Sequence, residues 1–218
     1  MLEPSRTEVA ITSSETVESP FASVLRDAWT SDRPHHHRLI LSAAVIATAL
    51  HRQGMRATLV GGGAIELHAP GVFQTGDIDF VVEGRSRFDI DVVMQSLGLA
   101  KRGRHWVMDD RFVEVPGSEV DVPVEIRNVG DFDLRVARKE SILADRIVGF
   151  RHWKYWAYGA QAITLLRTFG KSVDEEELRR VLRREGAEHA YDLLRDFADS
   201  DEEVTLAQLD AAWHAHYR

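Results

Sequence analysis

The chain has 218 residues, of which 27 are basic and 35 acidic, so its formal net charge at pH 7 is −8. With 44% hydrophobic and 28% charged residues it has the composition of an ordinary globular protein, which excludes extensive disorder and fibrous architecture. Cysteine is absent, which excludes disulfide frameworks, zinc knuckles and thiol catalysis, and the negative charge excludes a surface that attracts nucleic acid as a whole.

The distribution of proline divides the chain into two parts. No proline follows position 123, and proline disfavours helix interiors, so the pattern predicts a mixed first part and a helical second part. The polar stretch 1–33 is predicted to be a flexible N-terminal arm with one short helix at 21–29. Residues 34–137 are predicted to form an α/β lobe, and residues 138–218 a helical C-terminal lobe.

The sequence also predicts where the protein resides. The first twenty residues carry four glutamates and no apolar core, which is unlike a signal peptide. The most apolar run, 39–50, has twelve residues and is too short to span a bilayer. We therefore expect a cytoplasmic protein with no membrane partner.

Periodicity and turn residues predict the elements in chain order. Apolar residues at helical spacing indicate a helix over 38–52 that Gly54 ends. A strand at 57–60 leads directly into three glycines. The predicted elements that follow are a helix at 64–68, a loop at 69–76, a strand at 78–82, a helix at 88–97, strands at 104–108, 111–115, 122–127 and 132–136, and helices at 140–153 and 160–169.

Two sequences with the spacing of a capping box predict further helix starts near the C-terminal end. They are Ser172-Val-Asp-Glu175 and Thr205-Leu-Ala-Gln208. In a capping box the first side chain bonds a backbone N–H three residues on, and the fourth side chain returns the bond. We therefore expect helices to begin at these two positions.

The first feature that carries chemistry is Asp77-Ile78-Asp79. Alternate residues of a strand project to the same face, so both carboxylates are expected to point together while Ile78 enters the core. Two neighbouring anions repel each other, and a cation relieves that repulsion. Because Mg²⁺ prefers oxygen ligands, the pair predicts a magnesium site.

The second feature is the glycine turn Gly61-Gly62-Gly63, between a predicted strand and a predicted helix. Such a turn lets backbone N–H groups approach a polyphosphate, and the positive end of the helix dipole favours the anion. Fourteen residues separate Gly62 from Asp77, enough for the chain to return on a neighbouring strand. The sequence therefore predicts a phosphate-binding turn and a metal site in one cleft.

Together, residues 59–84 resemble the signature of the DNA polymerase β-type nucleotidyltransferase superfamily: a hydrophobic residue, Gly-Gly, a spacer, and Asp-hydrophobic-Asp. The resemblance implies an α/β nucleotidyltransferase fold, with a small mixed sheet flanked by helices and a helical C-terminal lobe. It also implies that the Gly-Gly turn holds a triphosphate. Asp77 and Asp79 would hold two Mg²⁺ ions, and a third carboxylate on a later strand would complete the site.

Other stretches resemble uncharacterised prokaryotic nucleotidyltransferase-like proteins, whose relatives include toxin transferases of abortive-infection systems. The stretches are Phe112-Val-Glu-Val-Pro116, Ala144-Asp-Arg146, His152-Trp153, Gln161-Ala162 and Arg184-Glu-Gly186. Three carboxylates qualify as the third metal ligand, because Glu114, Asp121 and Glu125 all stand between apolar neighbours on strand-like segments. The resemblance favours Glu114.

Arg146 and Lys154 are the candidate nucleotide-binding cations of the helical lobe. They lie eight residues apart on one predicted helix, which places them on roughly the same face, where they could meet nucleotide phosphates. The alternative is that they form salt bridges on the helix surface with Asp145 or Glu140.

The expected activity is Mg²⁺-dependent transfer of a nucleoside monophosphate from a nucleoside triphosphate, such as ATP, to an acceptor. The acceptor is a small molecule, tRNA or protein that the sequence does not identify. Two alternatives stay open. In the first alternative, the chain is a toxin-type transferase that acts on tRNA or protein beside an antitoxin. In the second, it is a non-catalytic nucleotide-binding or interaction module of the same fold.

Overall fold

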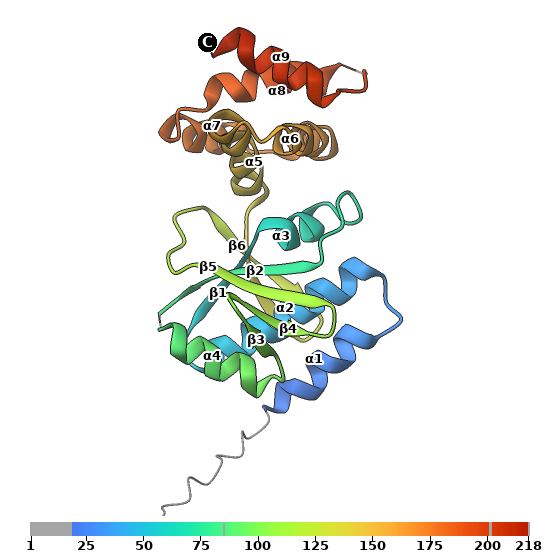
Figure 1. Cartoon of the computed structure of the whole chain (residues 1–218), viewed down its shortest axis with the longest axis vertical. Helices are drawn as coiled ribbons and strands as arrows, with labels where there is room; N and C mark the ends of the chain where they lie inside the picture. Colours follow the sequence, from blue (N-terminus) through green and yellow to red (C-terminus); the bar gives the residue numbers. More distant parts are fainter. Residues whose placement is uncertain (1–18, 85, 201, 218) are drawn as a thin grey trace, which may run out of the picture.

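The computed structural model describes residues 19–84, 86–200 and 202–217, and Figure 1 shows an α/β part with a stack of helices at one end. The α/β part consists of α1 (Pro20–Thr30), α2 (His35–Arg52), β1 (Arg56–Val60), α3 (Gly61–His68), β2 (Asp77–Glu83), α4 (Arg87–Ser96), β3 (Ala100–Arg102), β4 (His105–Met108), β5 (Arg111–Gly117), β6 (Val124–Val129) and β7 (Phe132–Ala137). The fold is the predicted one: a mixed sheet flanked by helices, followed by a helical part.

Helix α1 shows that the predicted arm is wrong from residue 19 onward. The helix lies where the sequence places it, but Leu25 is fully buried and Phe21 and Trp29 are nearly so. These apolar residues repeat at helical spacing and pack into the core against α2, because an amphipathic helix buries its apolar side. Residues 1–18 of the predicted arm lie outside the described residues.

The seven strands within the described residues form one sheet in the order β3-β4-β5-β2-β1-β7-β6. Strand β2 lies at its centre, antiparallel to β1 and parallel to β5, and β1 is in turn parallel to β7. Along β2, Ile78, Phe80 and Val82 are buried while Asp77 and Asp79 alternate with them on the other side. The alternation predicted for this strand is therefore confirmed, and one side of the sheet forms the core.

The second part contains α5 (Lys139–Trp153), α6 (Trp156–Phe169), a 3₁₀ turn (Gly170–Ser172), α7 (Glu175–Arg184), α8 (Glu188–Asp199) and α9 (Leu206–His216). The capping box predicted at Thr205 and Gln208 is present. The one predicted at Ser172 is absent, because Asp174 caps α7 instead by accepting a hydrogen bond from the amide of Glu177 (3.0 Å). Aspartate is among the best N-caps, so it takes the position two residues later.

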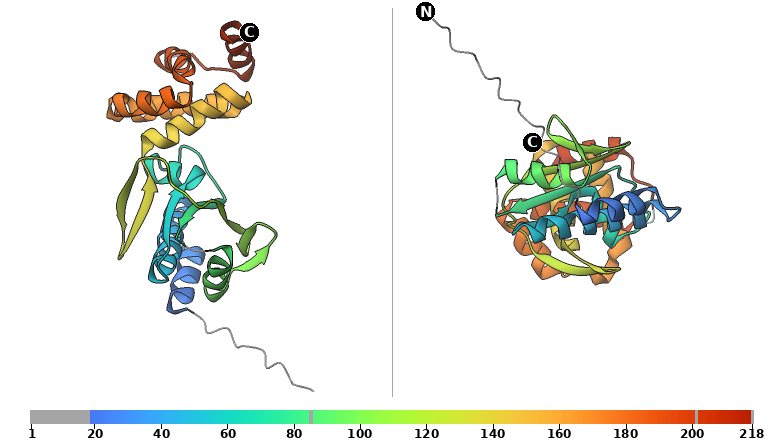
Figure 2. Two further views of the ribbon diagram at one scale, coloured as in Figure 1. Left: turned by 90° about the vertical axis from the view of Figure 1, so that its left-hand side faces the viewer. Right: turned by 90° about the horizontal axis from the view of Figure 1, so that it is seen from below.

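A buried carboxylate joins the two parts of the molecule where β7 leads into α5. Glu140 is fully buried and accepts a hydrogen bond from the amide of Asp174 (2.9 Å), ahead of α7. Arg138, the single residue between β7 and α5, lies 3.6 Å from Glu140 Oε2 and 2.6 Å from Glu177 Oε2. The side view in Figure 2 shows the helices stacked beyond the end of the sheet. None of the described helices has the length and apolar character needed to cross a membrane.

Candidate active site

Two carboxylates face each other across the centre of the sheet. Asp79 on β2 is the partner of Glu114 on β5, and Asp77 is the partner of Phe112 one pair earlier. Partners on parallel strands project to the same side of a sheet, so Asp77, Asp79 and Glu114 lie on the side away from the core. Of the three carboxylates that the sequence leaves open, Glu114 is the one beside Asp79.

The other two candidate carboxylates are not paired with Asp79. Asp121, in the loop after β5, belongs to the wall of the cleft described below, but its side chain is exposed and forms an ion pair with Arg184 of α7 (3.1 Å). Glu125 lies on the edge strand β6, where it contacts Arg127 and lies 4.0 Å from His68.

The glycine turn meets these carboxylates through its first residue. Val60, the last residue of β1, is the partner of Asp79, so the turn begins beside that carboxylate. Gly61 has a φ of +59°, and a Cβ atom there would lie 2.5 Å from Asp79 Oδ2. Only glycine fits both the left-handed backbone and the space.

Gly62 and Gly63 have other surroundings. A Cβ atom at Gly62 would lie 2.8 Å from the Cβ and Oγ1 atoms of Thr75, and one at Gly63 would lie 3.0 Å from the side chain of Leu59. Neither has the positive φ found at Gly61. The close approach of Gly62 is therefore to the loop before β2, and Gly61 is the glycine next to the carboxylates.

Asp79 is held at unusual electrostatic cost. Its pKa is raised to about 6, first by burial and then by the charges of Asp77 and Glu114, while Arg146 and His105 act in the opposite direction. A carboxyl group with such a pKa lacks a sufficient counter-charge. The site as it stands would therefore gain stability from a cation.

Glu114 already has two cationic or hydrogen-bonding neighbours. Arg104 Nε lies 3.2 Å from its Oε1 atom, and His105 Nε2 lies 3.1 Å from its Oε2 atom. Both come from the hairpin strand β4 or the turn before it, where His105 is the direct partner of Glu114. Within the described parts of the chain, no three acidic or histidine side chains are grouped so as to hold a metal ion.

A cleft of about 500 Å³ opens between this side of the sheet and the helices α5 and α6. Its walls include Gly61, Asp79 and Glu114 from the sheet, and Ser141, Asp145, Arg146 and Tyr158 from the helices. The cleft thus brings together one glycine of the turn, two of the three predicted metal ligands and one of the two predicted cations.

Arg146 is fixed within the cleft by three neighbours. Its Nε atom donates to Gln161 Oε1 (2.7 Å), its Nη1 atom pairs with Asp145, and its guanidinium stacks on the ring of Tyr158 at 4.2 Å from the centroid. The arginine is only 6% exposed. A cation held in this way faces the cleft with little freedom to move.

Lys154 does not share this face. Helix α5 ends at Trp153, and Lys154 follows it with a left-handed φ of 54°. Its ammonium group lies over the ring of Trp213, 4.3 Å from the centroid, and it is not part of the cleft wall. The prediction that Arg146 and Lys154 share a helix face is wrong, because the helix ends one residue too early.

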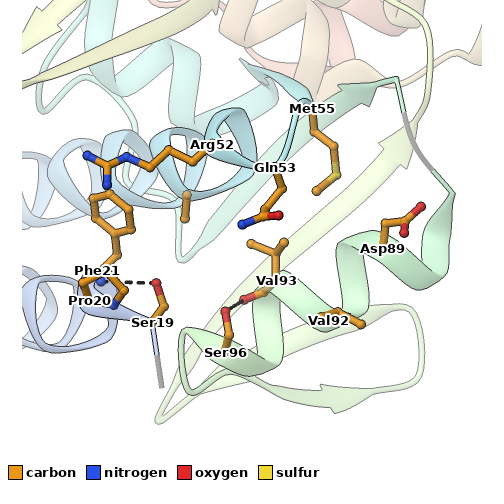
Figure 3. Close-up of a pocket in the computed structure, with 11 residues that line it drawn as sticks. Ser19, Pro20, Phe21, Arg52, Gln53, Met55, Asp89, Val92, Val93 and Ser96 are labelled. Carbon is orange, nitrogen blue, oxygen red and sulfur yellow. Dashed lines mark hydrogen bonds between the residues drawn. The ribbon is translucent and has the colours of Figure 1, made fainter. Parts of the chain in front are cut away.

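A larger cavity, of about 610 Å³, lies at the other side of the α/β part (Figure 3). It is bounded by the start of α1, the end of α2 and by α4. Its one carboxylate, Asp89, closes the capping box of α4 with Ser86. The cavity therefore lacks a pair of neighbouring carboxylates like Asp79 and Glu114 in the cleft, and it is not a candidate for binding a metal ion and phosphate.

Comparison with known proteins identifies the fold. No family model matches the chain, and no curated protein matches it. The solution structure of the antibiotic-resistance factor ANT(2'')-Ia, with substrate-regulated conformation dynamics, is 14% identical in sequence, has a TM-score of 0.50, and is matched over 67% of this chain and 90% of its own.

A second solved structure is the antigenic nucleotidyltransferase-like protein from Paracoccidioides brasiliensis. It is 16% identical, has a TM-score of 0.48, and is matched over 81% of this chain and 92% of its own. From the likeness to ANT(2'')-Ia and from the sheet and helices described above, we conclude that the chain has the nucleotidyltransferase fold.

Proposed function

We propose that the protein is a nucleotidyltransferase that moves a nucleoside monophosphate from a nucleoside triphosphate to the hydroxyl group of an acceptor. The observation that carries the proposal is the pairing of Asp79 with Glu114 beside Gly61, in a cleft whose opposite wall holds Arg146. Phosphoryl and nucleotidyl transfer depend mainly on positioning and on neutralising charge, and these four residues supply both.

The carboxylates fit magnesium as a cofactor. They are oxygen donors of the kind that Mg²⁺ prefers, and the pKa of Asp79 is raised by burial and by the neighbouring charges of Asp77 and Glu114. Asp77, Asp79 and Glu114 are not grouped as a metal site in this structure, so they would hold the metal after Glu114 had released Arg104 and His105 and the three side chains had moved together. Two bound Mg²⁺ ions would lower the pKa of the acceptor hydroxyl and neutralise charge on the departing pyrophosphate.

The chain's own residues perform the remaining tasks. Gly61 leaves the space beside Asp79 free of a side chain, so that the α-phosphate can reach the carboxylates. The first turn of α3 has no side-chain cap, which leaves backbone N–H groups for phosphate oxygens. Arg146, fixed by Gln161 and Asp145, contributes a positive charge from the opposite wall.

The acceptor, a small molecule, tRNA or protein, stays a prediction from the sequence, as do the toxin role and its antitoxin. The proposed transfer needs no reactant other than the nucleoside triphosphate and the acceptor. The acceptor oxygen forms a bond to the α-phosphorus, the bond to the bridging oxygen breaks, pyrophosphate leaves, and the hydroxyl proton is lost to solvent or a base.

The test compares wild-type protein with Asp79→Asn in isothermal titrations with ATP and Mg²⁺, and in assays of label transfer from α-labelled nucleotides to fractionated cell extract. Loss of Mg²⁺-dependent binding and transfer in Asp79→Asn is expected. The matched control is Glu125→Gln, which removes a carboxylate from the edge strand of the same sheet and should leave both unchanged. Equal Mg²⁺-ATP affinity in wild type and Asp79→Asn would contradict the proposal.

A second comparison separates catalysis from simple binding. Glu114→Gln should lower turnover by two or more orders of magnitude, on the scale of losing a group that stabilises the transition state, whereas Asp121→Asn should change it little. Should wild-type protein bind Mg²⁺-ATP yet release no pyrophosphate with any extract fraction, the fold would serve as a nucleotide-binding module instead.

A further inference from the structure

Three hydrogen-bond donors converge on the core side of the sheet, at the corner where α1 meets α2. Trp29, at the end of α1, is 4% exposed, and Arg111, at the start of β5, is 9% exposed. The guanidinium carbon of Arg111 lies 5.4 Å from the centroid of the Trp29 ring. Arg38, near the start of α2, lies close enough for its charge to lower the pKa of Arg111.

These donors lack acceptors. The indole Nε1 of Trp29 and the Nε of Arg38 are both buried and have no hydrogen-bond partner among the described residues. The one carboxylate that the described structure places within 4.0 Å of a nitrogen of Arg111 is Asp110, at 3.9 Å, and its side chain is 89% exposed. So exposed a contact offsets little of the charge of a buried guanidinium.

The arrangement is costly without an additional group. Burial lowers the pKa of Arg111, and the nearby charge of Arg38 lowers it further, with Asp110 as the weaker opposing influence. Buried donors are normally paired, and an unpaired cluster of them in a folded protein points to a missing anion or water. Because the positive charge of Arg38 acts on Arg111, a negative charge would stabilise this corner more than a neutral acceptor would.

We propose that Arg38, Arg111 and the indole N–H of Trp29 bind a phosphate dianion, either free phosphate or the phosphate group of a monoester. Two negative charges balance the two guanidinium groups, and the phosphate oxygens provide acceptors for both arginines and for the indole. A carboxylate has one charge and would leave one arginine uncompensated. Arg38 is half-buried, so the group bound there has a route to solvent.

This site is separate from the cleft. Along β5, Arg111 is buried with Val113, whereas Glu114 and Phe112 alternate with them on the other side. The sheet therefore lies between the proposed phosphate site and the carboxylates of Asp77 and Asp79. The inference does not depend on the proposed transferase activity, and each can fail alone.

The experiment follows the indole N–H signal of Trp29 in ¹H–¹⁵N spectra of the full chain, assigned by its loss in Trp29→Phe. Inorganic phosphate and glycerol 3-phosphate are titrated separately at constant ionic strength, with sodium acetate as the single-charge comparison. A saturable shift with phosphate or with glycerol 3-phosphate, and a weaker one with acetate, is expected. The tighter of the two phosphate probes identifies the source of the group.

Variants locate the binding. Arg38→Gln, at a half-buried position, should keep the fold and weaken phosphate binding by about ten-fold or more, as expected for loss of a charged hydrogen bond. Arg111→Gln should do the same if it folds. Arg180→Gln, 62% exposed on α7, and Arg146→Gln in the cleft should leave the Trp29 shift intact.

The response of the melting temperature to added phosphate gives a second measurement, because a change in packing alone would not alter that response. Without phosphate, Arg38→Gln should melt no lower than wild type, because it removes repulsion from Arg111. Added phosphate should raise the melting temperature of wild type but not of Arg38→Gln. An unmoved Trp29 signal, or equal phosphate affinity in wild type and Arg38→Gln, would overturn the proposal.

Discussion

Asp79 is the residue at which stability and the proposed chemistry oppose each other. Its pKa is raised from 3.8 to about 6, so the folded protein keeps this proton to a higher pH than the unfolded chain does. The resulting stabilisation is present below about pH 4 and is lost as the pH rises through about 6. At neutral pH the ionised carboxylate therefore destabilises the metal-free fold.

Replacing Asp79 with asparagine should raise the free energy of unfolding at pH 7.5 by about 1–2 kcal/mol, after allowance for solvent screening. Below pH 4 the difference from wild type should nearly vanish. Urea unfolding with a chelator present, at both pH values, measures this. The control is Asp131→Asn, at an exposed turn, whose difference in stability from wild type should be the same at both pH values. A variant less stable than wild type at pH 7.5 would contradict the electrostatic account.

Gly61 is the residue where backbone and side-chain constraints coincide. Gly61→Ala should cost about 1–2 kcal/mol from the left-handed backbone, and more from the contact with Asp79. In the double variant Gly61→Ala/Asp79→Ala, the cost of the contact with Asp79 should disappear, whereas the cost of the left-handed backbone should remain. Thermal unfolding of the four proteins in this cycle separates the two terms.

Gly76 provides the matched control for that cycle. Nothing lies within 4 Å of the position that its Cβ would take, and its φ is not in the left-handed region. Gly76→Ala should therefore change stability little. Gly62 is the poorer test, since an alanine there meets Thr75 whether or not a nucleotide binds. Unchanged stability in Gly61→Ala would show that the turn adapts.

At the scale of elements, α1 offers a direct test of whether it is an arm or part of the core. Leu25 has no exposed surface, whereas its neighbour Val24 is 36% exposed. Leu25→Ala should lower the free energy of unfolding by about 2–4 kcal/mol, as large-to-small changes in cores do. Val24→Ala should cost well under half of that. If Leu25→Ala and Val24→Ala had equally small effects on the free energy of unfolding, α1 would be a loosely attached arm and not part of the core.

Sequence reasoning located most elements because their periodicity is local. The helix at 38–52, the glycine turn and the alternation around Ile78 are confirmed by the structure. The pairing of His105 with Glu114 also had a local signal. Strands separated by the two residues 109–110 pair with a register that the turn length sets, so His105 could have been placed opposite Glu114.

The remaining features depend on information that the local pattern lacks. Strand β3 has three residues, two of them basic, and shows no alternation long enough to detect. The left-handed conformation of Lys154 depends on how α6 packs back on α5. The pairing of Asp79 with Glu114 joins parallel strands far apart in the chain, and the lack of acceptors near Trp29 is visible only after α1, α2 and β5 have packed together.

At the scale of the whole molecule, Glu140 connects the sheet to the helical part. It has no exposed surface and accepts from the amide of Asp174. Glu140→Ala should destabilise the protein by about 1–3 kcal/mol, because it leaves the amide of Asp174 without its acceptor. Glu176→Ala, at an exposed position of α7, should change stability by less than about 0.5 kcal/mol. Similar effects of both in urea unfolding would rule out the role of Glu140.

The order of strands in the sheet has a consequence for the way the protein is made. Strand β1, which ends at Val60 just before Gly61, has β7 as one of its two neighbours, with Leu59 the partner of Val136. Five other strands, β2 to β6, are synthesised between these two. The middle of the sheet therefore stays open during translation until β7 has left the ribosome, and Arg146 follows soon after it. Long-range pairing of this kind folds slowly, so the cleft is among the last features of the α/β part to form on a nascent chain.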